Sequence, residues 1–189
     1  MKFSNEGFRE YAECIAKYLG VVPKNLSFYW KGRVGLYALL RAINVTHSDE
    51  VVVPAFTCVV VPNAVLYSGA MPIYADINRR TLNPSLEAIK QAVTQKTKVI
   101  IVQNTFGLTT DVDKIASYAK SKGIYTIEDC THGFGGTFSG QPNGTFCDAA
   151  FYSTQWNKPF STGIGGISLL QNSEYRENLN TVVQQLESP

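Results

Sequence analysis

Short runs of apolar residues alternate along the chain with longer stretches of helical periodicity. Each run holds three or four residues, favours strand formation, and shows no clean alternation of apolar and polar positions. The runs are Val51–Val53, Ile73–Ala75, Val99–Val102, Tyr125–Ile127, Ala149–Tyr152 and Ile167–Leu170. Strands that are apolar on both faces are typical of a parallel sheet with helices on both sides.

Helices are predicted between these runs. One covers residues 34–43, and a second begins with Asn83 as its cap and Pro84 at the first helical position, continuing to about Val93. A third covers residues 110–122, opened by a threonine with an aspartate three residues later and closed before a glycine. Strand and helix in alternation predict a layered α/β domain.

Two further helices are predicted outside this alternation. The first twenty residues are amphipathic, with Phe8, Tyr11, Ile15 and Tyr18 spaced by three or four. Because this helix precedes the sheet, it is a candidate to pack on a neighbouring molecule instead of this core. Residues 173–186 predict a polar helix without a C-terminal cap, which we interpret as the sign of an interrupted protein.

Composition and charge exclude several classes of protein. With 189 residues, 44% of them hydrophobic, the chain is large enough for one domain with a real core. The net charge of +2 leaves no basic face for nucleic acid, and no apolar stretch approaches the ~20 residues of a membrane span. Charged residues make up 17% of the chain against about 25% in typical domains, which favours a surface hidden against a partner.

The cysteines and histidines indicate a cytoplasmic protein without a metal site. The chain has four cysteines, with no C-x-x-C pair and no secretory leader, so neither a disulfide framework nor a zinc knuckle is predicted. Only His47 and His132 offer an imidazole, which excludes a histidine-rich metal centre.

Chemically active side chains follow the predicted strands. Asp129 and His132 come after the fourth run, Ser153 and Lys158 come after the fifth, and Arg33 stands at the start of the first helix. Ligands of open α/β sheets bind at the carboxyl ends of the strands, so these residues are expected at one edge.

Pyridoxal phosphate (PLP) fits this set better than other common cofactors. A lysine amine bonds covalently to an aldehyde, and a carboxylate facing the pyridine nitrogen keeps that nitrogen protonated. A helix N-terminus and a serine hydroxyl bind phosphate. Each feature alone also has an ordinary explanation, because a single lysine in a loop is commonly a surface residue and an aspartate after a strand is commonly a turn residue. The chain lacks G-x-G-x-x-G and a P-loop, which disfavours dinucleotide and nucleoside-triphosphate sites.

At these residues the chain resembles the DegT–DnrJ–StrS group of PLP-dependent sugar aminotransferases, which have the aspartate-aminotransferase fold. The similar segments run in order from about Phe28 to Asn172. They are GRVGLYALLRAINVTHSDEVVVPAFTCVVVPNAVLYSGAMPIYADINRRTLNPSLEAI, TKVIIVQNTFG, IEDCTHGFGG, GTFCDAAFYS and KPFSTGIGG. The resemblance implies a three-layer α/β/α large domain with a mainly parallel sheet. It further implies residues 1–26 as a helical arm, 27–172 as the PLP-binding domain, and 173–189 as the start of a helix leading to an absent C-terminal domain.

The resemblance also assigns roles to individual residues. Lys158 matches the lysine that holds PLP and serves as the catalytic base, and Asp129 matches the carboxylate on the pyridine nitrogen. His132 matches a position beside the phenolic oxygen of the cofactor. Ser153 matches a phosphate-binding hydroxyl, and the phosphate is also held by the backbone N–H groups at the positions of Arg33 and Val34.

One position departs from the family pattern. Cys58 stands where many members carry an aromatic residue that stacks on the pyridine. Either Phe56 or Phe106 supplies the ring face, or the stacking is weaker.

The implied reaction is transfer of an amino group, commonly from glutamate, to a keto group of a nucleotide-linked sugar in a cytoplasmic homodimer. Two alternatives stay open: a non-catalytic domain of the same fold that binds PLP or a partner, and a different PLP reaction such as elimination or dehydration. Lys158 counts against the related sugar dehydratases, in which that lysine is replaced.

Overall fold

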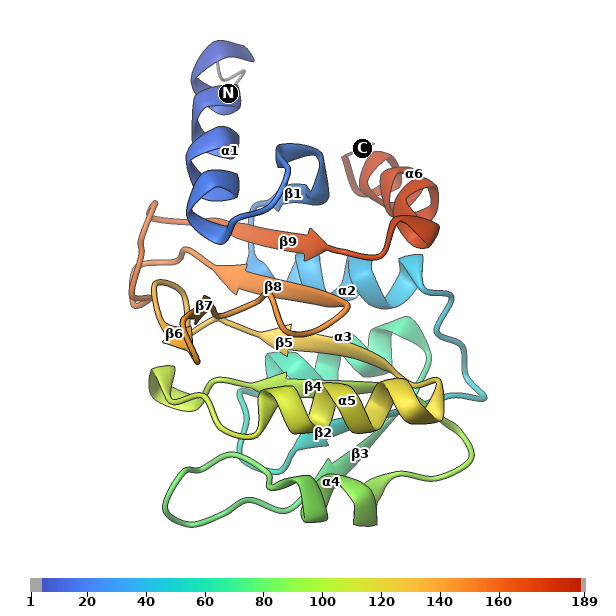
Figure 1. Ribbon diagram of the computed structural model, residues 1–189. Helices are drawn as coiled ribbons and strands as arrows, with labels where there is room; N and C mark the ends of the chain where they lie inside the picture. Colours follow the sequence, from blue (N-terminus) through green and yellow to red (C-terminus); the bar gives the residue numbers. More distant parts are fainter. Residues whose placement is uncertain (1–4, 188–189) are drawn as a thin grey trace.

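A seven-stranded sheet forms the centre of the molecule (Figure 1). The structure is a computed structural model that describes residues 5–187, so the ends of the predicted N-terminal arm and C-terminal segment (1–4 and 188–189) lie outside it. The strands stand in the order β1-β9-β8-β5-β4-β2-β3. Their bounds are β1 Leu26–Tyr29, β2 Glu50–Pro54, β3 Met71–Ala75, β4 Thr97–Gln103, β5 Tyr125–Asp129, β8 Ala149–Ser153 and β9 Gly166–Leu170. All pairs from β3 to β8 are parallel, whereas β9 is antiparallel to both β8 and β1. The prediction of a mainly parallel sheet is confirmed.

Helices cover both faces of the sheet, as a layered α/β fold requires. The helices are α1 Asn5–Leu19, α2 Gly32–Ala42, α3 Val60–Ser68, α4 Leu86–Ala92, α5 Val112–Lys122 and α6 Arg176–Glu187. Short 3-10 turns stand at Pro23–Asn25, Thr105–Gly107 and Ser173–Tyr175. The α2, α3 and α6 helices pack on one face, and α1, α4 and α5 pack on the other. The molecule is therefore a three-layer α/β/α structure.

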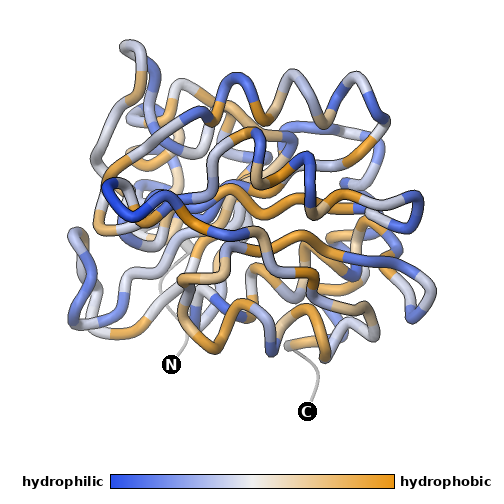
Figure 2. The backbone as a smooth tube through the Cα atoms, turned by 90° about the horizontal axis from the view of Figure 1, so that it is seen from below, coloured by the Kyte–Doolittle hydropathy of each residue, from blue (hydrophilic) through white to orange (hydrophobic). Residues whose placement is uncertain are grey.

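The central strands alternate their apolar side chains between the two faces. In β4, Val99 and Ile101 pack toward α2 and α3, whereas Ile100 and Val102 pack toward α4 and α5. Figure 2 shows the hydrophobic positions gathered along the strands in the middle of the molecule and the hydrophilic ones toward the loop tips. Burial on both faces explains why these strands are continuous apolar runs in the sequence.

Four elements were not predicted from the sequence. The α3 helix is apolar all round, so its sequence has no polar face that would produce a helical period. The β1 strand is a short edge strand, and β6 (Thr137–Phe138) and β7 (Gln141–Pro142) pair in a two-residue hairpin. Such short elements carry little periodicity.

Two helices begin later than predicted. The α4 helix is capped by Ser85, whose hydroxyl accepts the N–H of Ala88 at 3.2 Å. Asn83 is buried instead, where its amide donates to the Leu108 carbonyl at 2.8 Å and its oxygen accepts the N–H of Thr105 at 3.1 Å. These long-range bonds remove Asn83 from capping. The α5 helix likewise begins at Val112, two residues after the predicted start at residue 110. Asp111, the residue before the helix, has a left-handed backbone with φ of 52°, which is not a helical conformation.

The α1 helix, considered from the sequence as a candidate to pack on a neighbouring molecule, packs on this chain's own sheet. Ile15, Ala16 and Leu19 are buried against β8 and β9. Phe8 and Tyr18 of the predicted stripe remain about half exposed. The C-terminal half of the helix therefore belongs to the core.

The α6 helix is joined to the body by polar contacts. The guanidinium of Arg176 donates to the side-chain oxygen of Asn25 at 3.2 Å and to the Leu170 carbonyl at 2.5 Å. The amide of Asn178 donates to the Ala42 carbonyl at 3.0 Å. This helix, predicted to be polar, nevertheless buries Leu179 against α2.

Within residues 5–187, no helix is both long and apolar enough to cross a membrane. In the same described part of the chain, His, Cys, Asp and Glu side chains form no group of three or more that could hold a metal ion. All four cysteines are free thiols.

Candidate active site

The carboxyl ends of β5 and β8 lie side by side and carry the first two predicted site residues. Asp129 is the last residue of β5 and Ser153 the last of β8, and both side chains are buried. The two strands are parallel, with Asp129 opposite Phe151. Both point toward the same edge in Figure 1, as predicted for a ligand site of an α/β sheet.

Asp129 is a buried carboxylate whose pKa responds to its burial, to Thr131 and to Lys158. Burial raises its pKa, while hydrogen bonding by Thr131 and the charge of Lys158 act in the opposite direction. The N–H of Thr131 donates to Asp129 Oδ1 at 3.0 Å. Lys158, half-buried in the segment after β8, is therefore close enough to stabilise the ionised carboxylate.

His132 is the third member of this group. Its ring stacks on Phe106 with centroids 5.6 Å apart and planes 9° apart, and its Nδ1 accepts the Phe106 N–H at 3.4 Å. Burial lowers the pKa of His132, and the charge of Lys158 lowers it further. A neutral imidazole with Nδ1 as acceptor carries its proton on Nε2, so Nε2 is the hydrogen-bond donor of the His132 ring.

The N-terminus of α2 stands against the end of β8 and the start of β9. A Cβ atom at Gly32 would lie 2.8 Å from the Tyr152 carbonyl oxygen and 3.1 Å from Ser153 Cβ. A Cβ at Gly166 would lie 2.3 Å from the Lys31 carbonyl carbon. Two glycines thus let the helix end approach the end of β8 at Tyr152 and Ser153 closely, and the N–H groups of a helix N-terminus are suited to bind an anion.

The two predicted phosphate-binding positions occupy the first turn of this helix. The N–H of Val34 donates to the Lys31 carbonyl at 3.1 Å. The N–H groups of Gly32 and Arg33 precede it, at positions without an intrahelical partner. Gly32 was not assigned a role from the sequence, although a glycine at a helix start after a strand is a usable signal for close backbone approach.

We expect Gly166→Ala to disrupt the close approach at the N-terminus of α2. The new methyl group would meet the backbone of Lys31 and Gly32, which cannot rotate away, so we expect a loss of about 1–3 kcal/mol of unfolding free energy and weaker phosphate binding. Gly35→Ala is the matched control, because its methyl would meet the Tyr29 ring at 3.2 Å and the Ile167 carbonyl oxygen at 3.6 Å without overlapping either, and α2 gains helix propensity. Urea unfolding of both variants measures the difference, and equal stabilities would contradict the close approach.

Cys58 lies in the exposed segment between β2 and α3. Of the two aromatic residues considered in its place, Phe106 stacks on His132, and Phe56 packs on Phe106 with ring centroids 6.2 Å apart. Phe106 is 70% exposed and has a left-handed backbone, with φ of 53°. The geometry therefore places the Phe106 ring on His132 and the Phe56 ring beside Phe106, and favours neither alone as the stacking surface.

A polar network beneath the site was missed by the sequence analysis. The amide of Asn104 donates to the buried Glu128 at 2.8 Å, and the Asn104 N–H donates to the Asp129 carbonyl at 3.1 Å. The amide of Gln103 donates to the Phe56 carbonyl at 3.1 Å. Gln103 is the last residue of β4 and Asn104 follows it. Because ligands of open α/β sheets bind at the carboxyl ends of the strands, the same reasoning that selected Asp129 and Ser153 could have found both residues.

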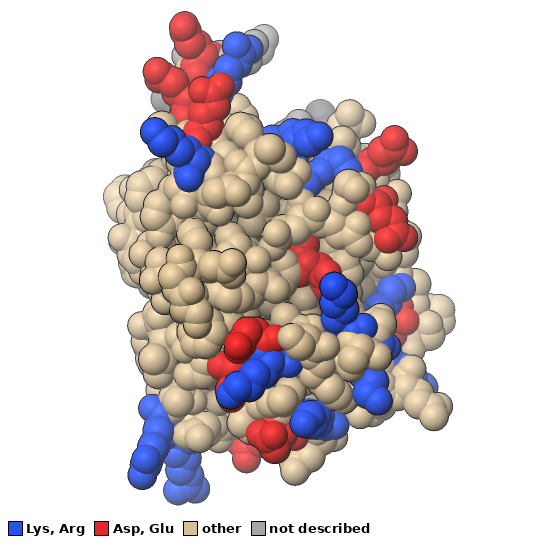
Figure 3. All heavy atoms as spheres, in the orientation of Figure 1, with Lys and Arg blue, Asp and Glu red and all other residues tan. Residues whose placement is uncertain are grey.

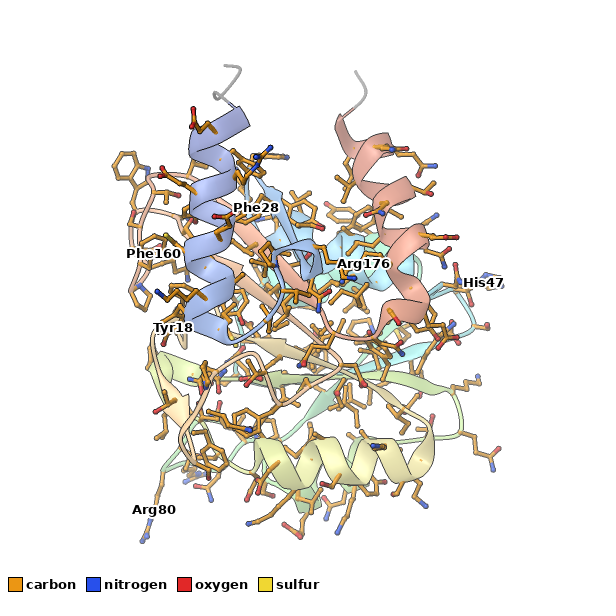
Figure 4. The ribbon with its side chains drawn as sticks, turned by 45° about the horizontal axis from the view of Figure 1, so that its top comes forward. Tyr18, Phe28, His47, Arg80, Phe160 and Arg176 are labelled. Atoms are coloured by element: carbon orange, nitrogen blue, oxygen red, sulfur yellow. The ribbon has the colours of Figure 1, made fainter. Side chains whose placement is uncertain are left out.

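The structure brings Asp129, His132, Ser153 and Lys158 to one edge of the sheet. His47 lies at the opposite end of the molecule and takes no part in the site (Figure 4). On the face seen in Figure 3, few charged side chains lie toward the edge where β5 and β8 end. The buried carboxylate, the amine and the helix N-terminus are the groups that a phosphorylated pyridine aldehyde requires.

Solved structures define the class of protein to which this fold belongs. The aminotransferase TlmJ from Streptoalloteichus hindustanus superposes with a TM-score of 0.88 at 26% identity, covering 92% of this chain and 47% of TlmJ. NtdA from Bacillus subtilis, solved with the bound cofactor PMP, superposes with a TM-score of 0.84 at 28% identity, covering 93% of this chain and 39% of NtdA. The fold is that of the large domain of PLP-dependent aminotransferases.

Residues 4–185 match the DegT/DnrJ/EryC1/StrS aminotransferase family, and the chain belongs to it. It is 38% identical over 136 residues to GDP-perosamine synthase of Escherichia coli O157:H7, covering 72% of this chain and 37% of that protein. It is 34% identical over 152 residues to dTDP-4-dehydro-2,3,6-trideoxy-D-glucose 4-aminotransferase of Saccharopolyspora spinosa, covering 80% of this chain and 40% of that protein. The chain thus spans about two fifths of the length of these relatives.

Proposed function

We propose that this chain is the cofactor-binding part of a PLP-dependent aminotransferase that acts on a nucleotide-linked sugar. The observation that carries the proposal is the meeting of Asp129, His132 and Lys158 beside the glycine-built N-terminus of α2. Membership of an aminotransferase family supports the reaction class. The boundaries of the binding unit, residues 27–172, and the lead of residues 173–189 into a further domain are part of this proposal.

Each residue of the site has a distinct task. PLP, when bound, supplies an electron sink for bonds broken at the substrate carbon. Asp129 keeps a pyridine nitrogen protonated, because its buried carboxylate gains most from a positive partner. Lys158 supplies the amine that holds the cofactor covalently and then moves a proton as a general base. Ser153 and the first N–H groups of α2 hold the phosphate, while His132 donates from Nε2.

The proposed substrates follow from the relatives. Their names include GDP-perosamine synthase, a dTDP-sugar 4-aminotransferase and a UDP-N-acetyl-dehydroglucosamine 3-aminotransferase. We therefore propose a nucleotide-linked keto sugar as amino acceptor and glutamate as donor. A cytoplasmic location is proposed from the free thiols and the nucleotide-linked substrate.

The function is tested by mixing the chain, and a longer form carrying its C-terminal continuation, with PLP. A visible absorbance band that disappears on addition of glutamate, with formation of PMP, supports an aminotransferase. A folded chain that binds no PLP in either form would overturn the proposal. A band that forms but does not respond to glutamate would point to the non-catalytic alternative.

We also propose that the protein is a homodimer and that α3 lies in its interface. Residues 51–75 contain no Lys, Arg, Asp or Glu, yet Val59, Leu66 and Tyr67 of this segment are 66%, 52% and 78% exposed. Exposed apolar surface without charge is typical of a contact between like subunits. Phe56 also lies in this segment, so a second subunit there would border the site.

Tyr67→Glu is expected to separate the subunits. A glutamate buried in a two-fold interface places unpaired charge in both copies, so the dimer should dissociate at protein concentrations at least roughly a hundredfold higher than for the unaltered chain. Val22→Glu, at an exposed apolar position away from α3, is the control. Light scattering over a dilution series measures the mass, and dissociation by both variants or by neither would contradict the placement of the interface.

A further inference from the structure

A continuous group of aromatic rings joins the α1 helix to both segments that carry the site residues. Phe134 stands two residues after His132, and Phe160 stands two residues after Lys158. The two rings pack on each other with centroids 5.3 Å apart. Phe134 also contacts Tyr152, next to Ser153, in an edge arrangement at 5.3 Å. The two site-bearing segments therefore meet in one aromatic cluster.

The α1 helix supplies the outer members of this cluster. Tyr11 stacks on Phe160 with centroids 6.5 Å apart and planes 16° apart, and Tyr18 packs on Phe134 at 5.6 Å. Figure 4 shows Tyr18 and Phe160 on the same side of α1 and Phe28 on its other side. Burial raises the pKa of Tyr11, which accords with a ring enclosed by its neighbours.

The segment that carries Lys158 has few backbone bonds of its own. After β8, the N–H of Lys158 donates to the Gln155 carbonyl at 3.0 Å, and the N–H of Thr162 donates to the Thr154 carbonyl at 2.9 Å. Trp156, Asn157, Pro159 and Ser161 are exposed. Phe160 is half-buried within this exposed stretch, so its ring is the main apolar anchor of the segment.

We propose that Tyr11 and Tyr18 are positioning residues, and that α1 holds the Lys158 and His132 segments in place through Phe160 and Phe134. We call the contacts of Tyr11 with Phe160 and of Tyr18 with Phe134 the clamp. The inference rests on the proposed function only because that function makes the Lys158 and His132 segments parts of a cofactor site. The clamp itself is a property of the cofactor-free chain. It gives the N-terminal helix a direct part in setting the site. Both tyrosines act through the rings that they contact, Phe160 and Phe134.

Hydrogen exchange of the cofactor-free chain tests the clamp. In Tyr11→Leu, the amides of Lys158 and Thr162 should exchange roughly two- to tenfold faster, the range expected for loss of one aromatic pair. In Tyr18→Leu, the amides of Gly133 and Phe134, which both donate to the Cys130 carbonyl, should respond similarly. Tyr11→Phe and Tyr18→Phe keep the rings and should restore the exchange rates of the unaltered chain.

Phe8→Leu is the matched control on the same helix. Phe8 packs on Phe28 with ring centroids 4.9 Å apart, as Tyr11 also does at 5.4 Å, but the ring that Phe8 contacts is neither Phe134 nor Phe160. Phe8→Leu should therefore leave the amides of Lys158 and Thr162 unchanged. Equal acceleration in Phe8→Leu and Tyr11→Leu, or no acceleration in either tyrosine variant, would overturn the proposal. Amides of β4 report whether each variant is folded, and Tyr11→Leu decides alone if Tyr18→Leu unfolds.

A second measurement links the clamp to the site. At limiting PLP, covalent capture should be slower in Tyr11→Leu than in the unaltered chain, whereas Phe8→Leu should react at the original rate. Absence of capture in the unaltered chain would count against the proposed function and leave the exchange result as the test of the clamp. Normal capture together with unchanged exchange in Tyr11→Leu would overturn the clamp and leave the proposed function intact.

Discussion

Lys158→Ala is expected to abolish covalent capture of PLP. In the unaltered chain, borohydride treatment should fix the cofactor to a single peptide that contains Lys158, because the charge of this lysine acts on the pKa of Asp129 at the carboxyl edge of the sheet. In the alanine variant that adduct should be absent, and transfer of the amino group from glutamate should fall by several orders of magnitude, since both the covalent attachment and the general base are lost.

Lys158→Arg separates the charge from the chemistry of the amine. Arginine keeps a positive charge near Asp129 but supplies no nucleophilic amine at neutral pH, so this variant should retain fold and stability without the adduct. Lys122→Ala, in the exposed last turn of α5, should behave as the unaltered chain. Peptide mass analysis decides the result, and an adduct on another lysine in the unaltered chain would contradict the assignment.

Asp129→Asn is expected to damage chemistry far more than folding. An amide cannot hold the pyridine nitrogen in its protonated form. In a form of the protein that catalyses transamination, the rate of the half-reaction with glutamate should therefore fall by several orders of magnitude. Glu128→Gln is the matched control, because Glu128 is also buried but bonds Asn104 beneath the site. Equal half-reaction rates for Asp129→Asn and the unaltered protein would remove Asp129 from this role.

The same substitution has a defined effect on cofactor-free stability. Burial raises the pKa of Asp129 in the folded state above its value in the unfolded state, so the folded state binds the proton more tightly. The stabilisation of the folded state that results from this tighter proton binding is lost as pH rises through the folded-state pKa. At neutral pH, Asp129→Asn should therefore melt at the same temperature as the unaltered chain or slightly higher. Below about pH 3.9, the pKa of an aspartate in the unfolded chain, Asp129 is protonated in both states, so its ionisation no longer makes the melting temperatures of Asp129→Asn and the unaltered chain differ.

The sequence by itself determined the layered architecture and the edge at which the site lies. Apolar runs without alternation can be buried only on both faces, so Val99–Val102 had to lie inside a sheet covered by helices. Parallel strands present their carboxyl ends at one edge, so Asp129 and Ser153 could be placed together without knowledge of their distance. Both conclusions depend on local pattern and on a geometric property common to all such sheets.

Tertiary structure alone decided which local signals were used. Asn83 has the sequence context of a helix cap, but its bonds to Thr105 and Leu108 hold it in the core and leave capping to Ser85. The α1 stripe is amphipathic in sequence, but only the folded chain shows that Tyr11 and Tyr18 meet Phe160 and Phe134. Periodicity predicts which face of an element is buried, but it does not predict which residues cover that face. For α1, the covering residues lie more than a hundred positions away in the sequence, and only the packing of the folded chain brings them there.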